Sequence, residues 1–361
     1  MKKRRLPKIL KLITTFTLVA AMIIGLAGCS ASSAENGTQE EANTSPIVIT
    51  WYPNESAVDY APARDAFAKV ITDATGREVE HKLTTDYTIA IEALASGSAD
   101  ICFMGAVGYI EVKNKNPEVD TLIVNSGASG TLDDAIYYSW LAVNKGNEAD
   151  YTDGSQYSIE NIQGKKISFV SNSSTSGFKV PTTNIIDLFK LTDAWKTITV
   201  DDLLEGGSDK FFSEVLFGGS HQGSAFNLVS GKCDVSAFCD TELAPYADLK
   251  EGTENTVGAI YAIKTGASAP FDTVQGKEFV IISSTPVLNG PFAYNPSNFS
   301  KDEIEKIRLA FMSEEVANNK QIFVDKASKE AGTVGMFKKT DKERFVLVDD
   351  AWYNPIREMG N

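Results

Sequence analysis

A strand–helix alternation occurs twice along the chain, and it limits the architecture more than any other pattern. Residues 47–109 read as a buried strand, an amphipathic helix, an alternating strand, a second helix and a third strand. Residues 165–240 repeat this order, and a further strand follows at 278–286. A β-α-β-α-β order predicts a parallel sheet with helices on its faces. We therefore expect an α/β protein built from two such units.

The N-terminal segment has the layout of a secretory signal rather than of a folded element. It combines a basic start, an apolar run and small residues that end at Gly28. The residues Leu26-Ala27-Gly28-Cys29 resemble the bacterial lipobox, in which the signal is cut before a cysteine that is then lipidated. An ordinary cleavage site and an uncleaved anchor are the alternatives. We expect a signal peptide at 1–28, lipidation of Cys29 and a polar, flexible tether over 29–45.

The rest of the chain is long enough for two lobes. About 315 residues exceed what one hydrophobic core usually serves. We expect lobe one at 46–144 and 288–361, and lobe two at 145–287. Two chain crossings, in YYSWLAVNK and TPVLNGPFAY, would form a hinge. No later run is long and apolar enough to span a bilayer.

The charge of the chain argues against a nucleic-acid ligand. The formal net charge is −14, and it becomes −20 without the signal because six basic residues and no acid precede Cys29. Such a chain repels phosphate backbones instead of releasing their counterions. A small anion would need a local, oriented site because the long-range field opposes it.

Cysteine and histidine are too sparse for a metal or redox centre. Cys233 and Cys239 lie on one expected strand, about 20 Å apart, which is beyond disulfide reach. Cys102 is the third cysteine of the folded part, and only His81 and His221 accompany them. No spacing typical of metal ligands occurs. We expect free, buried cysteines, no metal and no cofactor.

Four hydroxyl residues stand where a buried strand gives way to a helix, in SNSSTSGFKVP at 171–181. A helix N-terminus has unpaired N–H groups and a partial positive charge, so it binds anions without a formal cation. Ser174, Thr175 and Ser176 would add hydroxyl donors there. A helix cap needs only one such residue, so anion binding and capping stand as equal interpretations of this stretch.

Three further side chains are candidates for the same site. His221 follows a strand and opens a helix, where it could donate to an oxyanion while backbone holds its other nitrogen. Tyr87 opens a helix of lobe one, and Tyr137 or Tyr138 lies at the first crossing. Taken singly, each is equally or better explained by packing or capping.

Catalysis finds little support in the sequence. A serine nucleophile needs a base and an orienting group, and one histidine among hydroxyls does not supply both. No P-loop, GxGxxG, HExxH or GxSxG pattern occurs. Asp240 and Glu242 form a carboxylate pair in FCDTEL, which an alternating strand would point the same way, but solvated loop acids are the simpler interpretation. We expect no enzymatic activity.

The stretch SNSSTSGFKVP resembles the phosphate-group signature of the phosphonate, phosphite and phosphate solute-binding proteins of ABC importers. Four further blocks resemble that family in the same order, namely DYTIAIEALASGSADICFMGAVGY, IYYSWLAVNK, GSHQGSAFNLVSGKCDVSAFCD and SSTPVLNGPF. The resemblance covers essentially the whole folded chain. It implies a type II periplasmic-binding-protein fold that encloses its ligand between two lobes and delivers it to permease and ATPase subunits.

The resemblance implies seven ligand contacts, which are Ser174, Thr175, Ser176, Tyr87, Tyr137, His221 and Asp240. The three hydroxyl residues would hold phosphonate oxygens, and Asp240 would accept a proton from a P–OH group. Relatives that bind aminoalkyl phosphonates hold the ammonium with two carboxylates, whose positions fall at Thr241 and Gly290 in this chain. Neither is acidic, and Glu242 could substitute only after a one-residue slip, which favours phosphite, phosphate or a small uncharged phosphonate.

The resemblance and the lipobox together imply an extracytoplasmic protein that a lipid anchor holds at the cell membrane. Three alternatives remain open at this point. The ligand could be another oxyanion, such as a sulfonate, or an aromatic compound. The protein could instead report ligand to a membrane receptor as a sensory binding protein, and an enzyme is the third possibility.

Overall fold

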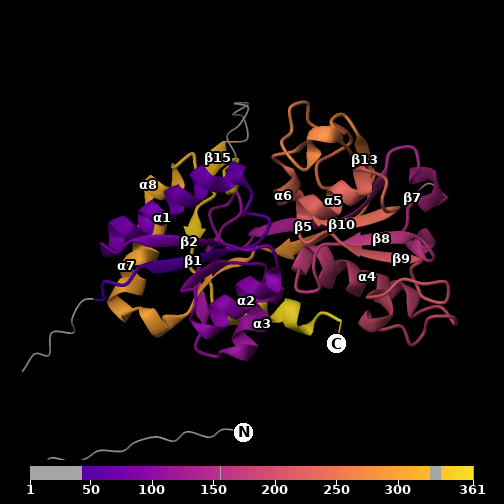
Figure 1. The fold of residues 1–361 in the computed structure, drawn as a ribbon. Coiled ribbons are helices and arrows are strands. Elements are labelled where there is room, and N and C mark those ends of the chain that lie inside the picture. The colour runs from indigo at the N-terminus through magenta and orange to yellow at the C-terminus, as the bar shows by residue number, and fades with distance from the viewer. Residues whose placement is uncertain (1–42, 155, 326–334, 361) are drawn as a thin grey trace, which may run out of the picture. The chain divides into compact units, whose positions relative to one another are not determined.

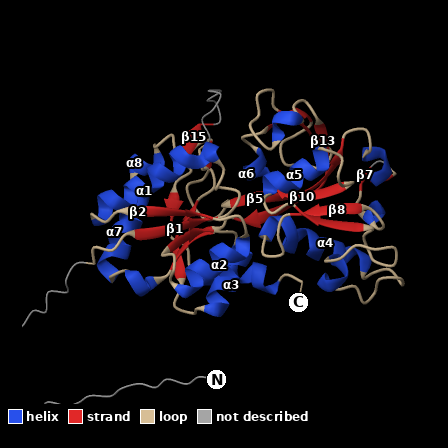
Figure 2. Ribbon diagram, viewed as in Figure 1, coloured by secondary structure: helices blue, strands red, loops and turns tan. Residues whose placement is uncertain are grey.

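The computed structural model describes residues 43–154, 156–325 and 335–360. The expected signal peptide, Cys29 and the expected tether as far as residue 42 lie outside these ranges. Across the described ranges, no helix combines the length and the apolar character that crossing a membrane requires. Two sheets organise this part of the chain, and helices lie on both faces of each sheet (Figure 1, Figure 2).

The first sheet contains six strands in the order β17-β4-β14-β3-β1-β2. They are β1 (Ile47–Trp51), β2 (Val79–Leu83), β3 (Ile101–Phe103), β4 (Asp120–Asn125), β14 (Pro291–Tyr294) and β17 (Phe345–Val346). Strand β1 is parallel to β2 and β3, whereas β14 and β17 run antiparallel to their neighbours. The predicted β-α-β-α-β order of this unit is confirmed, because α1 (Ala61–Thr75) and α2 (Tyr87–Ser96) separate the first three strands.

Aromatic packing closes one face of the first sheet. Helix α1 packs against α7 (Lys301–Phe311), and the ring of Phe67 stacks on Phe292 and Phe311 at centroid distances of 4.1 and 4.2 Å. Helix α2 packs against α3 (Ala106–Lys115), and the short helices α8 (Glu314–Ala317) and α9 (Asn354–Glu358) complete this unit. Gly76 ends α1 at φ 75°, as its place after the predicted helix indicates.

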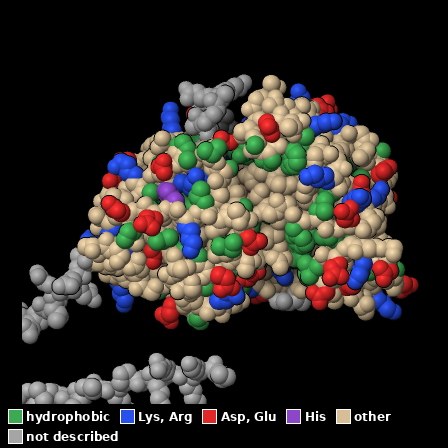
Figure 3. Space-filling view, in the orientation of Figure 1, with side chains coloured by type: hydrophobic (Ala, Val, Ile, Leu, Met, Phe, Trp, Pro, Cys, Tyr) green, Lys and Arg blue, Asp and Glu red, His purple; other side chains and the backbone are tan. Residues whose placement is uncertain are grey.

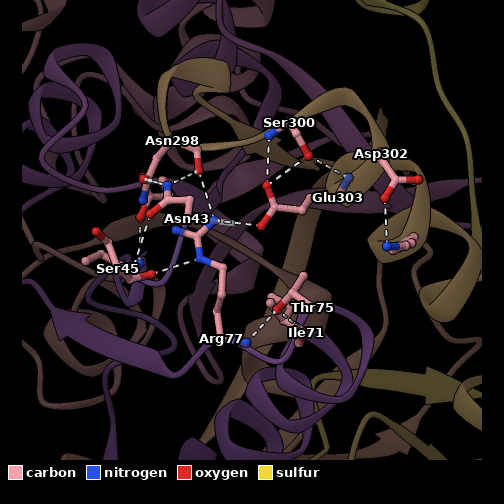
Figure 4. A network of polar contacts seen from close by, with 12 residues as sticks. Asn43, Ser45, Ile71, Thr75, Arg77, Asn298, Ser300, Asp302 and Glu303 are labelled. Atoms are coloured by element: carbon pink, nitrogen blue, oxygen red, sulfur yellow. Dashed lines mark hydrogen bonds and ion pairs between the residues drawn. The ribbon is translucent and has the colours of Figure 1, made fainter. Parts of the chain in front are cut away.

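Arg77 ties the entry of the chain into β1 to the start of α7 (Figure 4). Its Nε donates to the main-chain oxygen of Ser45 at 2.8 Å, and its Nη1 donates to Asn298 O at 2.9 Å and to Glu303 Oε1 at 3.1 Å. Glu303 also completes the capping box with Ser300. Ser45, the last residue of the expected tether, is thus hydrogen-bonded to α7's unit through Arg77.

The second sheet contains seven strands in the order β11-β12-β13-β5-β10-β8-β9. They are β5 (Ile136–Asn144), β8 (Lys166–Phe169), β9 (Glu214–Phe217), β10 (Val235–Cys239), β11 (Ala247–Glu251), β12 (Ile260–Ile263) and β13 (Glu278–Leu288). Strand β8 is parallel to β9 and β10. Helices α4 (Val180–Phe189) and α5 (His221–Val229) separate these strands along the chain, so the second predicted β-α-β-α-β order is also confirmed.

Short strands and 3-10 turns lie outside the two main sheets. Strand β6 (Thr152–Asp153) pairs with β7 (Gln156–Tyr157), and β15 (Phe323–Asp325) pairs with β16 (Phe337–Lys339). Helix α6 (Asp240–Leu243) follows β10 directly. Short 3-10 turns lie at Val58–Tyr60, Glu148–Tyr151, Glu160–Ile162, Val200–Leu203, Phe271–Thr273, Pro296–Asn298 and Asp350–Tyr353. Cys102, Cys233 and Cys239 are free and buried, as expected.

The described chain passes between the sheets after β4 and again after β13. Hydrogen bonds join the two crossings, because Asn289 N–H donates to Ala135 O at 3.0 Å and Asn289 Nδ2 donates to Asn125 O at 2.8 Å. Strand β5 pairs along its length with β10 and β13 of the second sheet. A division by sheets therefore ends lobe one before β5, and the boundary that we drew at Asn144 falls at the far end of this strand.

Candidate functional site

A cavity of about 70 Å3 lies where loops of the two sheets face each other. Six of the seven predicted contacts line it, namely Ser174, Thr175, Ser176, Tyr87, Tyr137 and His221. About 10–15 Å3 accommodates one water molecule, so the cavity suits a ligand of roughly five to seven heavy atoms. Six of the seven predicted contacts thus come together around one cavity, and their contact with a ligand stays a prediction.

Several helix N-termini open onto this cavity. Helix α2 begins at Tyr87, α5 begins at His221, and α3 follows the cavity residue Gly105. A turn of π-helix over Thr175–Lys179 leads directly into α4. The described residues that line the cavity include no lysine or arginine, and acidic and basic side chains are interspersed on the face in Figure 3. Helix dipoles, not cations, therefore make the cavity attractive to an anion.

The three hydroxyl residues of the predicted signature have different partners. Ser174 Oγ accepts from Gly177 N–H at 3.1 Å and caps the helix. Thr175 Oγ1 accepts at 2.9 Å from the N–H of Val107, in the first turn of α3. Ser176 Oγ is buried and has no hydrogen-bond partner among the described residues. Ser174 thus acts as a helix cap, and the Ser176 hydroxyl is the candidate donor for a ligand.

One hydrogen bond to the main chain and one to the ring hold His221 in place. Its own N–H donates to Asn54 Oδ1 at 3.0 Å, and Cys239 N–H donates to its Nδ1 at 3.1 Å. Because Nδ1 accepts, we assign the ring proton to Nε2. Burial lowers the pKa of His221 to about 3, so the ring is neutral at neutral pH. The side chain is therefore a neutral N–H donor whose other nitrogen is held by backbone.

Two phenols add donors to the lining. Asn54 Nδ2 donates to Tyr87 Oη at 2.8 Å, which leaves the phenol proton of Tyr87 available to another acceptor. The ring of Tyr52 packs on Tyr87 with a centroid distance of 4.0 Å and holds it in place. Tyr137 lines the cavity from β5. Burial raises the pKa of Tyr87 and of Tyr137, so both phenols stay protonated.

Asp240 does not line the cavity. Its Oδ1 accepts from Tyr138 N–H at 2.8 Å, and its Oδ2 accepts from Asn255 Nδ2 at 3.1 Å. The stretch that we expected to be extended forms α6, and a helical turn directs Asp240 and Glu242 differently where a strand would align them. The position of Asp240 therefore does not suit the ligand contact that the resemblance implied; its carboxylate joins α6 to β5.

The cavity is also lined by two carboxyl groups to which the sequence analysis assigned no ligand contact. Glu55 follows β1, and Glu242 belongs to α6. Glu242 Oε2 accepts from Tyr60 Oη and from Gln222 Nε2, each at 3.1 Å. Glu55 Oε2 is buried without a hydrogen-bond partner among the described residues. Burial raises the pKa of both groups, that of Glu242 to about 7.

The positions at which relatives carry acids do reach the cavity. Thr241 and Gly290 both line it, and a Cβ at Gly290 would lie 2.2 Å from the main-chain oxygen of Met104. A side chain at Gly290 would therefore require the backbone to move. The carboxyl groups of this cavity come from other positions, which ungapped matching of blocks does not reveal.

The profile of one protein family matches most of the chain. That family is described as the periplasmic substrate-binding protein of phosphonate ABC transporters, and the match covers residues 49–353. The chain belongs to this family. The predicted family is thereby confirmed, and with it the class of transport proteins that bind a substrate outside the cytoplasm.

Relatives of this substrate-binding protein are known from sequence and structure. The phosphate-import protein PhnD of Mycolicibacterium smegmatis is 26% identical over 252 residues, which cover 67% of this chain and 71% of that protein. A binding-protein component of a phosphonate ABC transporter from Pseudomonas aeruginosa has a TM-score of 0.60 and 20% identity, covering 88% of this chain and 85% of its own. PhnD1 of Prochlorococcus marinus, solved with methylphosphonate, has a TM-score of 0.59 and 14% identity, covering 88% and 98%. These likenesses confirm the predicted type II fold.

Proposed function

We propose that this substrate-binding protein captures a phosphorus oxyanion, a phosphonate, phosphite or phosphate, and delivers it to an ABC permease and its ATPase. The ligand would lie between lobe one, at 46–135 and 289–361, and lobe two, at 136–288. These bounds adjust the expected ones to the strands of each sheet. Lipidated Cys29 and the tether would hold the protein at the outer side of the cell membrane.

The observation that carries this proposal is the buried hydroxyl of Ser176, which has no hydrogen-bond partner among the described residues, in a cavity whose donors are neutral. A buried polar group without a partner costs about 1–3 kcal/mol. An oxyanion in the cavity would accept from this hydroxyl, from the phenols of Tyr87 and Tyr137 and from Nε2 of His221. Hydrogen bonds to a charged acceptor are the strong ones, so these donors would contribute most when the ligand is an anion.

The volume of the cavity and the ligands of the relatives favour a small phosphorus oxyanion over a larger ligand. A cavity for roughly five to seven heavy atoms matches the size of a tetrahedral oxyanion with a short substituent. The Prochlorococcus relative was solved with methylphosphonate, and the mycobacterial relative is a phosphate-import protein. Both ligands have the tetrahedral phosphorus group that the donors of this cavity would bind.

Contacts between the two lobes describe a closed arrangement. Val107 N–H of lobe one donates to Thr175 Oγ1 of lobe two, and Asn54 of lobe one accepts from His221 N–H of lobe two. These contacts hold the lobes together beside the cavity, and separation of the lobes at the crossings would widen the way in for a ligand. Rotation about a two-stranded hinge is a common mode of closure in binding proteins.

Titration calorimetry with a set of ligands tests the proposal. The purified protein would be titrated with phosphate, phosphite, methylphosphonate and 2-aminoethylphosphonate, and with sulfate and methylsulfonate as matched oxyanions without phosphorus. We expect saturable one-to-one binding of at least one phosphorus ligand and weaker or no binding of the sulfur compounds. Tighter binding of a sulfur compound, or no binding of any phosphorus compound, would overturn the proposal.

A further inference from the structure

We infer that Glu55 and Glu242 form a proton-holding subsite, so that the lobes close over a phosphorus oxyanion together with one proton. This inference rests on the proposed function of the same cavity. With a simple oxyanion, the two carboxyl groups would share the proton. With a ligand that carries an ammonium group, that group would donate to the pair in place of the proton.

The geometry brings one carboxyl group from each lobe to the same point. Glu55 lies in the loop after β1, and its side chain is 2% exposed. Glu242 lies in α6 of the other lobe, and the two carboxyl groups are within hydrogen-bonding reach of each other. Two adjacent carboxylates in a buried site cannot both ionise at moderate cost. The closed site therefore needs a proton or another cationic donor between them.

The charged neighbours do not supply that donor. Arg64 of α1 lowers the pKa of Glu55, but its Nη1 donates to the main-chain oxygens of Glu55 and Ala57. The nearby carboxylate of Asp240 raises the pKa of Glu242 further, and Lys338 of β16 acts on Asp240. The pair is left with one net negative charge when it holds a proton and with two when it does not.

The remaining groups that face the pair are neutral. Tyr60 and Gln222 donate to Glu242, and His221 is a neutral donor on the same lining. The other facing groups are phenols and thiols with raised pKa values, namely Tyr52, Tyr87, Tyr137, Tyr246, Cys102 and Cys239. A proton therefore halves the negative charge of the Glu55–Glu242 pair that an incoming oxyanion meets. None of the facing groups named here carries a positive charge that could do the same.

The sign of the pH effect follows from opening and closing. In the open form both carboxyl groups contact water and ionise near their ordinary pKa, whereas closure raises the pKa of Glu242 to about 7. A raised pKa in the closed form means that closure takes up a proton. Its contribution to affinity is complete below about pH 4 and is lost as the pH rises through about 7. Affinity for a simple oxyanion should fall up to about tenfold per pH unit within this window.

Proton-linked calorimetry on the full chain in detergent tests the inference. Methylphosphonate is titrated at about pH 6 in two buffers with different ionisation enthalpies, which gives the number of protons taken up on binding. We expect an uptake in the wild type that exceeds that of the double variant Glu55→Gln/Glu242→Gln by about one proton. The titration of the ligand itself is common to both proteins and cancels in this difference. The control Glu92→Gln removes an exposed carboxyl group of α2 that pairs with Lys115 of α3, and it should match the wild type.

The same measurement with 2-aminoethylphosphonate distinguishes a proton from a ligand ammonium group as the donor to the Glu55–Glu242 pair. We expect the excess uptake to disappear with this ligand, because its ammonium group occupies the position of the proton. Methylphosphonate binding with equal proton uptake in wild type and double variant would overturn the inference and leave the proposed function standing. Absence of binding by all phosphorus ligands would overturn both. Should the double variant fail to fold, equal wild-type uptake at about pH 6 and pH 9, after subtraction of the ligand's own titration, would also contradict the inference.

Discussion

The main-chain N–H of Cys239 donates to Nδ1 of His221 at 3.1 Å. Because that nitrogen accepts, the imidazole presents a neutral Nε2–H donor on the lining of the cavity. The donors of the site are thus neutral side chains and helix N-termini. A chain of formal charge −14 opposes anions at long range, and such short-range groups are the means by which it can still hold one.

Replacement of His221 by its two amide analogues should separate the roles of its nitrogens. His221→Gln keeps an N–H donor near the position of Nε2, whereas His221→Asn keeps an acceptor near Nδ1. We expect methylphosphonate affinity to fall about 10- to 100-fold in the Asn variant, from one lost charge-assisted bond, and less in the Gln variant. Calorimetry measures both. Equal losses, or a larger loss in the Gln variant, would contradict the donor assignment.

The serine run should show one effect on stability and another on binding. Ser174→Ala removes a helix cap and should lower the free energy of unfolding by about 0.5–2 kcal/mol. Ser176→Ala should weaken ligand binding by about 1.5–3 kcal/mol without destabilising the protein, because no hydrogen bond to the lost hydroxyl is found among the described residues. Ser230→Ala, at an exposed position after α5, is the matched control. Urea unfolding and calorimetry distinguish these outcomes, and a Ser176→Ala variant with wild-type affinity would refute the assignment.

Asp240→Asn should leave ligand affinity within about threefold of the wild type, because a contact at this residue would cost tenfold or more. Burial raises the pKa of Asp240 to about 6. The stability that its protonated form gives is therefore present below about pH 4 and lost as the pH rises through about 6. The Asn variant avoids this loss, so its stability relative to the wild type should increase by about 1–3 kcal/mol between about pH 4 and 7. A tenfold loss of affinity would restore Asp240 as a ligand contact.

Asn54 should act on binding partly through Tyr87. It donates to the phenol of Tyr87 at 2.8 Å and accepts from His221 N–H across the lobes. Asn54→Ala and Tyr87→Phe should each weaken methylphosphonate binding, and the double variant should lose less than the sum, with a coupling energy of about 0.5–3 kcal/mol. Glu92→Gln, combined with Asn54→Ala, is the control and should show no coupling. Strictly additive losses in the Asn54 and Tyr87 pair would show that the hydrogen bond does not position the phenol.

Local sequence patterns predicted the architecture well because parallel β-α-β units have strong local signals. The strand and helix bounds of both units follow from apolar periodicity, caps and glycines such as Gly76. The lobe boundary at Asn144 stays a prediction, and a division by sheets would place it before β5, which pairs with β10 and β13 far along the chain. No local pattern states which sheet a strand joins.

The site residues divide in the same way. Ser176 and His221 stand at strand-to-helix junctions, and such junctions meet at one edge of a sheet. Glu55 follows β1 at an equivalent junction, so the same rule could have identified it. Glu242 was considered, but α6 forms where a strand was expected, and its helical turn directs Asp240 and Glu242 to different sides. The change from strand to helix depends on tertiary packing, which the six letters FCDTEL do not encode.

The measurement that addresses the central claim most directly is a crystal structure of the protein grown with saturating methylphosphonate. We predict one tetrahedral phosphorus group in the cavity, with its oxygens about 2.7–3.2 Å from Ser176 Oγ and His221 Nε2. A ligand bound elsewhere, or a closed cavity that holds no phosphorus group, would contradict the account.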